Sequence, residues 1–359
     1  MALPTQLPSA RHVTRLSLPL IGAFVVGAIA YGGLYTFPAL SVAFAEEFGV
    51  SRTVAVTPWT MFLLVTAISS PLLGRAYDEF ADRDLLTASM ILLAAGWLAM
   101  YLAPDISIVI LAYAAFHALG LQLAFIGTTT AIARRYAGVS GLALGIAYAG
   151  PGIGVAVALP VAAGLIQTAG WRSTSLAFLA ASLLGVVFVW LMTAGPRVLV
   201  PARPASGTTR EKESEFAARA SGLHETAAPG AVSAGFDAII GGGVLLAFGA
   251  ASDAPALALV GIMAHGVGTG ATIAVRSAAL SDVFSGPNFG TIFGFMAVAY
   301  PVGGAIAVYT GSLSADRFGN YLPLVALVMV ALVGWAVALW IAGPRRRGGR
   351  SRTSPASSD

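Results

Sequence analysis

The residues whose side chains could most readily bind a ligand or transfer a proton are an arginine and two histidines that interrupt long apolar stretches of the sequence. Arg276 could anchor a substrate carboxylate, because a guanidinium group binds a carboxylate through two parallel hydrogen bonds. It could also extend its charge toward the end of its helix or pair with an acid. His117 and His265 could line a cavity, relay protons or hydrogen-bond a ligand, although a single helical histidine is more often a packing residue.

Three further polar side chains lie in such stretches. Tyr31, Tyr35 and Gln122 could present hydroxyl and amide groups to a substrate, or could hydrogen-bond between helices. The sequence has no H-E-x-x-H motif, no Walker sequence and no cysteine. We therefore predict that the chain is not an enzyme and that it carries no cofactor and no metal.

The composition indicates what kind of elements must position these side chains. Of the 359 residues, 57% are hydrophobic and 10% are charged, whereas soluble domains carry about 25% charged residues. The mean hydropathy is +0.82. We therefore predict an all-α polytopic membrane protein whose partners are the lipid bilayer and a small-molecule substrate. The net charge of +4 does not indicate nucleic-acid binding, because the basic residues lie in loops beside apolar stretches.

About ten apolar stretches are long enough to cross a bilayer, which takes about 20 residues per helix. They lie at 17–43, 55–74, 85–103, 106–133, 141–167, 173–194, 231–252, 255–279, 288–313 and 319–343. Prolines, small residues and mixed charges mark 196–230 as a cytoplasmic linker. The predicted organisation is a cytoplasmic tail (1–16), a six-helix half (17–195), the linker (196–230), a four-helix half (231–343) and a basic cytoplasmic tail (344–359).

The lysine and arginine positions predict the orientation. With the N-terminus inside, sixteen of the 20 basic residues fall on the inner side and three on the outer side. Cytoplasmic loops of membrane proteins carry such an excess. We therefore predict a multi-pass protein of the cell (inner or plasma) membrane with both termini in the cytoplasm.

A repeated glycine and proline pattern marks one helix in each half. The pattern is Gly-x-x-x-Gly followed by a proline, and it occurs at 141–151 and at 290–301. In the first copy, Gly150, Pro151 and Gly154 thin the helix and interrupt its backbone hydrogen bonds. A neighbouring helix could therefore approach closely and pivot there, although static packing would use the same residues.

The loop after the second stretch reads Gly74-Arg-Ala-Tyr-Asp78-Glu-Phe-Ala-Asp-Arg83. With the order of the other features, it resembles the major facilitator superfamily, in the branch of monocarboxylate and oxalate/formate carriers. It keeps the glycine, the aspartate and one arginine of the family's G-x-x-x-D-R-x-G-R-R loop, and departs from it at Glu79 and Ala81. The resemblance implies a helical bundle in two halves, with Gly74, Asp78 and Arg83 in the conformational gate. It also implies that the family's seventh and eighth helices have no counterpart here.

We therefore predict a secondary active transporter of the major facilitator type, which works by alternating access between two halves. If Arg276 faces a water-filled cavity, the substrates are small organic anions such as monocarboxylates. The gate would consist of Gly74, Asp78 and Arg83 together with Gly150, Pro151 and Gly154. The alternatives are a channel or a non-transporting remnant and, less favoured by the motifs, an intramembrane enzyme.

Overall fold

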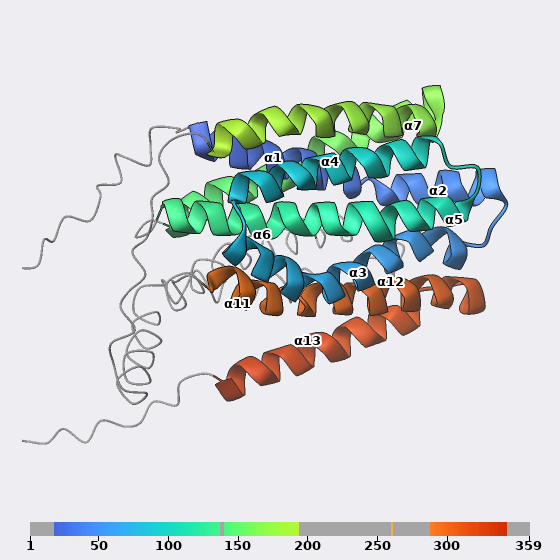
Figure 1. Ribbon diagram of the computed structural model, residues 1–359. Coiled ribbons are helices and arrows are strands. Elements are labelled where there is room, and N and C mark those ends of the chain that lie inside the picture. The colour runs from blue at the N-terminus through green and yellow to red at the C-terminus, as the bar shows by residue number, and fades with distance from the viewer. Residues whose placement is uncertain (1–17, 137–139, 194–259, 261–287, 343–359) are drawn as a thin grey trace, which may run out of the picture.

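The computed structural model describes residues 18–136, 140–193, 260 and 288–342. All regular secondary structure in these ranges is helical, and the helices lie side by side as an elongated bundle (Figure 1). In chain order they are α1 (Leu18–Leu34), α2 (Phe37–Phe48), α3 (Arg52–Glu79), α4 (Asp82–Tyr101), α5 (Ile106–Leu111), the π-helix η2 (Ala112–His117), α6 (Ala118–Arg135), α7 (Ser140–Thr193), α11 (Phe289–Met296), α12 (Ala299–Phe318) and α13 (Leu322–Ala342).

The helix lengths confirm the predicted fold class, an all-α multi-pass membrane protein. Within the described ranges, six helical segments are long and apolar enough to cross a bilayer. Several extend beyond the predicted apolar stretch, as Arg52–Glu79 does beyond 55–74. The extra residues include the charged ones at the helix ends, where a helix leaves the hydrocarbon core and enters the headgroup region. The total of ten spans stays a prediction.

Local sequence explains where several of these helices begin. Pro38 lies in the first turn of α2, where a missing backbone N–H costs nothing. Ser51 caps α3 by accepting a hydrogen bond from the backbone N–H of Val54, at 3.4 Å. Asp105 caps α5 through the backbone N–H of Ser107, at 2.8 Å. Polar caps thus define the short turns that connect the apolar spans.

The 54-residue helix α7 consists of two arms that fold back on each other. Gly170 has φ 79° and ψ 163°, a backbone conformation that favours glycine, and it breaks the helix. A straight helix of this length would measure about 81 Å, much more than the ~30 Å hydrocarbon core. The first part of α1 contacts both arms, since Gly22 lies against Met192 and Gly150 lies against Phe24. The two spans predicted in this stretch are therefore both present.

Close backbone contact joins α1 to the first arm of α7. A Cβ atom at Gly150 would overlap the carbonyl oxygen of Phe24, and one at Gly154 would overlap that of Ala28. The ring of Pro151 lies over Gly27. The glycine and proline segment singled out in the sequence thus lets two helices touch inside the N-terminal half, whereas its role in the gate stays a prediction.

On another side of the bundle, α3 packs along α11 and α12, and α13 packs against α12 (Figure 1). These three C-terminal helices correspond to the spans predicted at 288–313 and 319–343. The other two spans predicted for this half, at 231–252 and 255–279, lie outside the described residues except for Val260. Arg276, His265 and the linker at 196–230 lie outside them as well.

Gly150 offers a direct test of this packing. We predict that Gly150→Leu lowers the free energy of unfolding by about 1–3 kcal/mol, because the added side chain must push α1 away from α7. Gly152 provides a matched control, since a Cβ there would meet nothing within 4 Å. Thermal unfolding of the purified variants measures the difference. Equal melting temperatures for Gly150→Leu and Gly152→Leu would contradict the assigned contact.

Candidate functional site

The strongest polar link between the N-terminal helices and α11 is made by Asp78, near the end of α3. Its Oδ1 accepts a hydrogen bond from the backbone N–H of Gly290, at 2.9 Å. Its Oδ2 accepts one from the backbone N–H of Thr291, at 2.8 Å, and one from the Thr291 hydroxyl, at 2.7 Å. Both amides lie in the first turn of α11, where N–H groups lack partners within the helix. Asp78 therefore caps α11, and its negative charge is favourable at the positive end of the helix dipole. We call this set of contacts the Asp78 clasp.

Arg134 of α6 completes the Asp78 clasp. Its guanidinium group donates to Oδ1 of Asp78, at 3.1 Å, and to Oδ1 of Asp82, at 3.2 Å. It also donates to the backbone carbonyl of Tyr77, at 3.1 Å. The Asp78 side chain is 9% exposed, so its charge is compensated by Arg134 and by the α11 amides rather than mainly by water.

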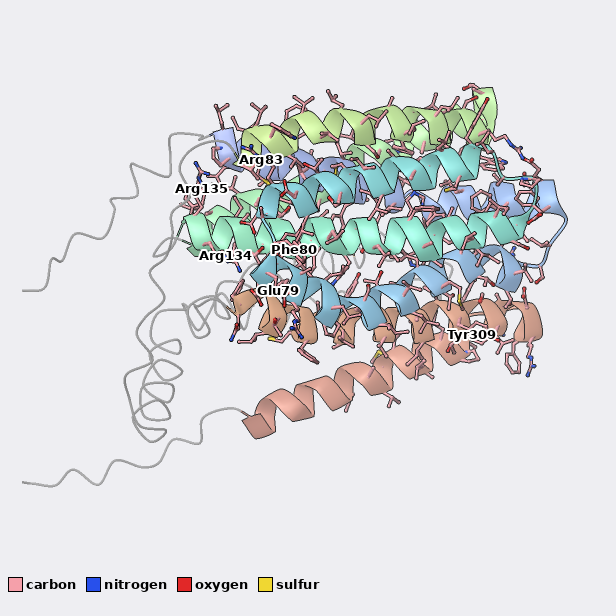
Figure 2. All side chains as sticks on the ribbon, viewed as in Figure 1. Glu79, Phe80, Arg83, Arg134, Arg135 and Tyr309 are labelled. Atoms are coloured by element: carbon pink, nitrogen blue, oxygen red, sulfur yellow. The ribbon has the colours of Figure 1, made fainter. Side chains whose placement is uncertain are left out.

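Arg83, which was expected to act in the gate with Asp78, contacts other residues. Its Nε donates to the hydroxyl of Thr193, at 3.1 Å, and its guanidinium carbon lies 4.6 Å from the ring centroid of Trp190. Arg83 therefore ties α4 to the second arm of α7, within the N-terminal half. Figure 2 shows Arg83, Arg134 and Arg135 at the same end of the bundle.

Glycines allow α3 and α11 to approach closely enough for the Asp78 clasp to form. A Cβ at Gly74 would overlap the carbonyl oxygen of Gly290, and a Cβ at Gly290 would overlap that of Gly74. A Cβ at Gly294 would in turn overlap the carbonyl oxygen of Ser70. Gly74, one of the predicted gate residues, therefore lies at the contact between the N-terminal helices and α11.

A second carboxylate links the opposite end of the same helices. Asp316 lies in the last turn of α12, and its Oδ2 accepts a hydrogen bond from the backbone N–H of Thr53, at 3.1 Å, and another from the Thr53 hydroxyl. Thr53 belongs to the first turn of α3, so Asp316 caps α3 as Asp78 caps α11. We call this contact the Asp316 clasp. The two ends of the bundle are named the Asp78 end and the Asp316 end.

An aromatic cluster lies between the two clasps. The hydroxyl groups of Tyr35 and Tyr300 are 3.3 Å apart and connect α1 with α12 across the interface. Tyr31 stacks on Tyr35 with ring centroids 5.6 Å apart. The cluster consists of Tyr31, Tyr35, Trp59, Phe125, Tyr148, Phe293 and Tyr300. Two of the predicted substrate-binding residues, Tyr31 and Tyr35, are thus brought together, and they are joined to the C-terminal helices.

The structure places Gln122 and His117 away from this cluster. Gln122 is buried, and its amide donates to the Ser70 hydroxyl, at 2.7 Å, which ties α6 to α3. His117 is fully buried at the end of the π-helix η2, between Trp97 and Tyr113. Within the described residues, neither ring nitrogen of His117 has a hydrogen-bond partner. Both side chains therefore lie inside the N-terminal half rather than at its contact with α11 and α12.

The N-terminal helices that carry one side of this interface match a known family. The family model described as Major Facilitator Superfamily matches residues 20–236, more than half of the chain. The chain belongs to the major facilitator superfamily. The model covers both the loop that carries Asp78 and the α7 arms. Membership agrees with the predicted family, whereas the narrower resemblance to the monocarboxylate and oxalate/formate branch stays a prediction, as does the missing helix pair.

Part of the chain is similar to a curated transporter. A stretch of 102 residues is 33% identical to the riboflavin transporter RibJ of Trypanosoma brucei brucei (strain 927/4 GUTat10.1). This stretch is 28% of the present chain and spans 19% of the length of that protein. The identity therefore concerns a limited part of both chains.

Several residues of this interface were not predicted from the sequence. Arg134 directly follows the apolar stretch at 106–133, and no motif distinguishes it from the other basic residues predicted on the inner side. Thr53, Asp316 and Tyr300 belong to no motif. Their partners are more than 260 residues away in the chain, so no local pattern in the sequence predicts these contacts. The Gly-x-x-x-Gly pattern at 290–294 marks a repeat of the pattern at 141–145, but it does not identify α3 as the neighbouring helix.

The Asp78 clasp predicts a specific pattern of amide protection. In Asp78→Asn, the amides of Gly290 and Thr291 lose a charged acceptor, so hydrogen exchange of the 288–296 segment should become about tenfold faster. Glu79→Gln is the matched control, because Glu79 pairs with Arg75 on the exposed surface, where ion pairs contribute little. Hydrogen exchange followed by mass spectrometry measures both variants. Unchanged exchange in Asp78→Asn would show that other groups protect the start of α11.

Proposed function

We propose that this protein is a secondary active transporter that moves a small molecule by alternating access. The observation that carries the proposal is the reciprocal capping of two antiparallel elements, α3 and the α11–α12 segment. At the Asp78 end, a carboxylate of α3 caps α11. At the Asp316 end, a carboxylate of α12 caps α3. Family membership supports the same function, since the repeated halves of such transporters rock against each other.

The geometry of the clasps suits a rocking motion. Each clasp lies at one end of the same helix contact, so breaking one of them opens that end without breaking the other. A hydrogen bond to a charged group contributes about 1.5–3 kcal/mol, and water can replace the lost partners when a clasp opens. This free energy is small enough for the difference in substrate affinity between two conformations to shift the equilibrium.

We further propose that the Asp78 end faces the cytoplasm. Arg83, Arg134 and Arg135 gather at this end, as Figure 2 shows. Cytoplasmic loops carry an excess of arginine and lysine, so their position favours this orientation. Thr193 and Gly290 lie at the same end, since Thr193 contacts Arg83 and Gly290 contacts Asp78. The predicted cytoplasmic location of residues 196–230 requires this arrangement.

Alternating access predicts opposite responses when the two clasps are broken. Because the chain has no cysteine, Ser312→Cys provides a single reporter one turn from Asp316. Asp316→Asn should raise the alkylation rate of this cysteine by roughly tenfold, because the Asp316 end opens more often. Asp78→Asn should lower the rate, because opening at the Asp78 end closes the other end. Maleimide labelling in membrane vesicles measures both rates.

The controls distinguish a transporter from the alternatives. Arg317→Gln changes an exposed charge beside Asp316 without touching the clasp and should leave the labelling rate unchanged. In a channel or a non-transporting remnant, the two ends need not respond in opposite directions. If Asp78→Asn leaves Ser312→Cys labelling unchanged or increases it, the rocking mechanism is wrong.

For the substrate, we propose small organic anions such as monocarboxylates, bound through Arg276. An arginine within a span is costly unless it is paired, reaches the interface or meets a ligand. The nearest acid in the following sequence, Asp282, is six residues away, a spacing that would place it on another face of an ideal helix. A cavity in which an anion can approach the guanidinium group would explain the retained charge.

A second candidate substrate is a planar aromatic compound. The aromatic cluster offers stacking faces, and the hydroxyls of Tyr35 and Tyr300 offer hydrogen bonds. The relative described as a riboflavin transporter favours the same chemistry, within the limited length of the match. Riboflavin therefore belongs beside lactate and oxalate in any uptake experiment.

Substitution of Arg276 tests the anion proposal. Arg276→Lys keeps the charge but loses the two-pronged geometry, so uptake of labelled lactate or oxalate into proteoliposomes should weaken severely while the protein still folds. Riboflavin uptake in the same vesicles should not depend on the guanidinium group. If Arg276→Gln transports the anions as well as the parent protein, Arg276 does not bind substrate.

A further inference from the structure

A cavity of about 770 Å³ lies at the Asp316 end, between α2, α3, α12 and α13. Its volume is within the range of small-molecule sites, about 300–1,000 Å³. It adjoins the Asp316 clasp, because Arg52 and Ala315 line it and are the chain neighbours of Thr53 and Asp316. Whatever fills the cavity therefore contacts both the N-terminal helices and the C-terminal helices.

The cavity is elongated along the helix axes. On α12 its lining runs from Ala307 to Ala315, which corresponds to about 12 Å at 1.5 Å per residue. The part farther from the helix ends is walled by the aliphatic side chains of Val56 and Val308. Val42 also lines the cavity and is 58% exposed, so the cavity continues onto an exposed apolar surface of a membrane-length helical segment.

The two serine hydroxyl groups in the wall, those of Ser41 and Ser312, do not change its apolar character. The Ser41 hydroxyl donates to the carbonyl oxygen of Pro38, at 2.9 Å. The Ser312 hydroxyl donates to the carbonyl oxygen of Tyr309, at 3.0 Å. Both donors are used within their own helices, so the long wall suits a hydrocarbon chain.

Two opposite charges lie at the other end of the cavity. Glu46 is in the last turn of α2 and Arg52 is the first residue of α3, and both side chains are exposed and line the cavity. Across the part of the chain that the structure describes, neither side chain is in an ion pair. The neighbouring charges are engaged elsewhere, since Glu47 pairs with Arg172 and Asp316 accepts from Thr53.

This arrangement specifies the chemistry of the ligand. The guanidinium group of Arg52 can bind an anion, and phosphate oxygens match its geometry. The carboxylate of Glu46 can bind a cation that donates N–H hydrogen bonds. The apolar wall can accommodate a hydrocarbon chain directed into the bilayer. A zwitterionic phospholipid with a primary-amine headgroup has all three features, and the bilayer around the protein can supply it.

We propose that the cavity binds one phospholipid with an ethanolamine headgroup, from the leaflet at the Asp316 end. Its phosphate binds Arg52, its ammonium group binds Glu46, and an acyl chain lies along Val56 and Val308. The bound lipid holds α2 and α3 against α12 and therefore stabilises the closed Asp316 end. This lipid site does not depend on the proposed transport activity.

Lipid retention by the purified full-length protein tests the proposal. The protein in detergent is incubated with equal amounts of dioleoyl phosphatidylethanolamine, phosphatidylcholine and phosphatidylglycerol, and bound lipid is identified by native mass spectrometry. The ethanolamine lipid should be retained preferentially, and Arg52→Gln should lower its retention by about tenfold through loss of the phosphate contact. Glu46→Gln should remove the preference over the choline and glycerol lipids, because the carboxylate selects the primary ammonium group.

Two further variants separate the site from the general lipid shell. Arg317→Gln removes an exposed charge at the same end that does not line the cavity, and retention should stay unchanged. Val308→Trp should reduce retention while both headgroup contacts remain, because the indole fills the apolar wall. Equal losses in Arg52→Gln and Arg317→Gln would overturn the proposal. Displacement of the lipid by soluble phosphoethanolamine at the same concentration would also overturn it, since the hydrocarbon chain would then contribute nothing.

Discussion

The first-turn amides of a membrane helix need acceptors, and in this protein the opposing half supplies an acceptor to α11 and, beside the local cap Ser51, to α3. Asp78 of α3 serves α11, and Asp316 of α12 serves α3. The carboxylates that join the two halves therefore also complete the first turns of the helices that lie opposite them. Separation at either end exposes a carboxylate and two or more polar donors together, and water is available at the helix ends to solvate them. This makes the contact between the halves specific, and it suits the reversible separation that the proposed rocking mechanism requires.

The interior of the N-terminal half is built differently. Tyr77 donates to the carbonyl oxygen of Leu123, at 2.8 Å, and Gln122 donates to Ser70, at 2.7 Å, so α3 is fastened to α6 along its buried face. These bonds lie away from water and cannot be exchanged for solvent without a large penalty. A rigid N-terminal half that presents α3 to a separate group of helices follows from this difference. The two faces of α3 thus have different roles.

The sequence predicted the elements better than their contacts. Apolar length located the spans, and the glycine and proline pattern located the close contact that Gly150 makes with α1. The sequence placed Asp78 and Arg83 together in a gate through their loop, whereas the structure pairs Asp78 with Arg134 and with the start of α11. Spacing along a chain restricts local neighbours only. The C-terminal helix that packs against α3 is determined by contacts between residues more than 200 positions apart. No pattern within a single span predicts such contacts.

The two clasps differ in strength, and this difference gives the interface a direction. Asp78 is nearly buried and accepts hydrogen bonds from Gly290, Thr291 and Arg134, whereas Asp316 is exposed and accepts from Thr53. Charged hydrogen bonds weaken as water and salt gain access to them, so the Asp78 clasp is the more stable of the two. Under the proposed rocking mechanism, the Asp316 end therefore opens more easily when nothing is bound. A molecule that contacts both sides of the interface near Asp316 has the larger effect on the resting conformation, because it strengthens the weaker clasp.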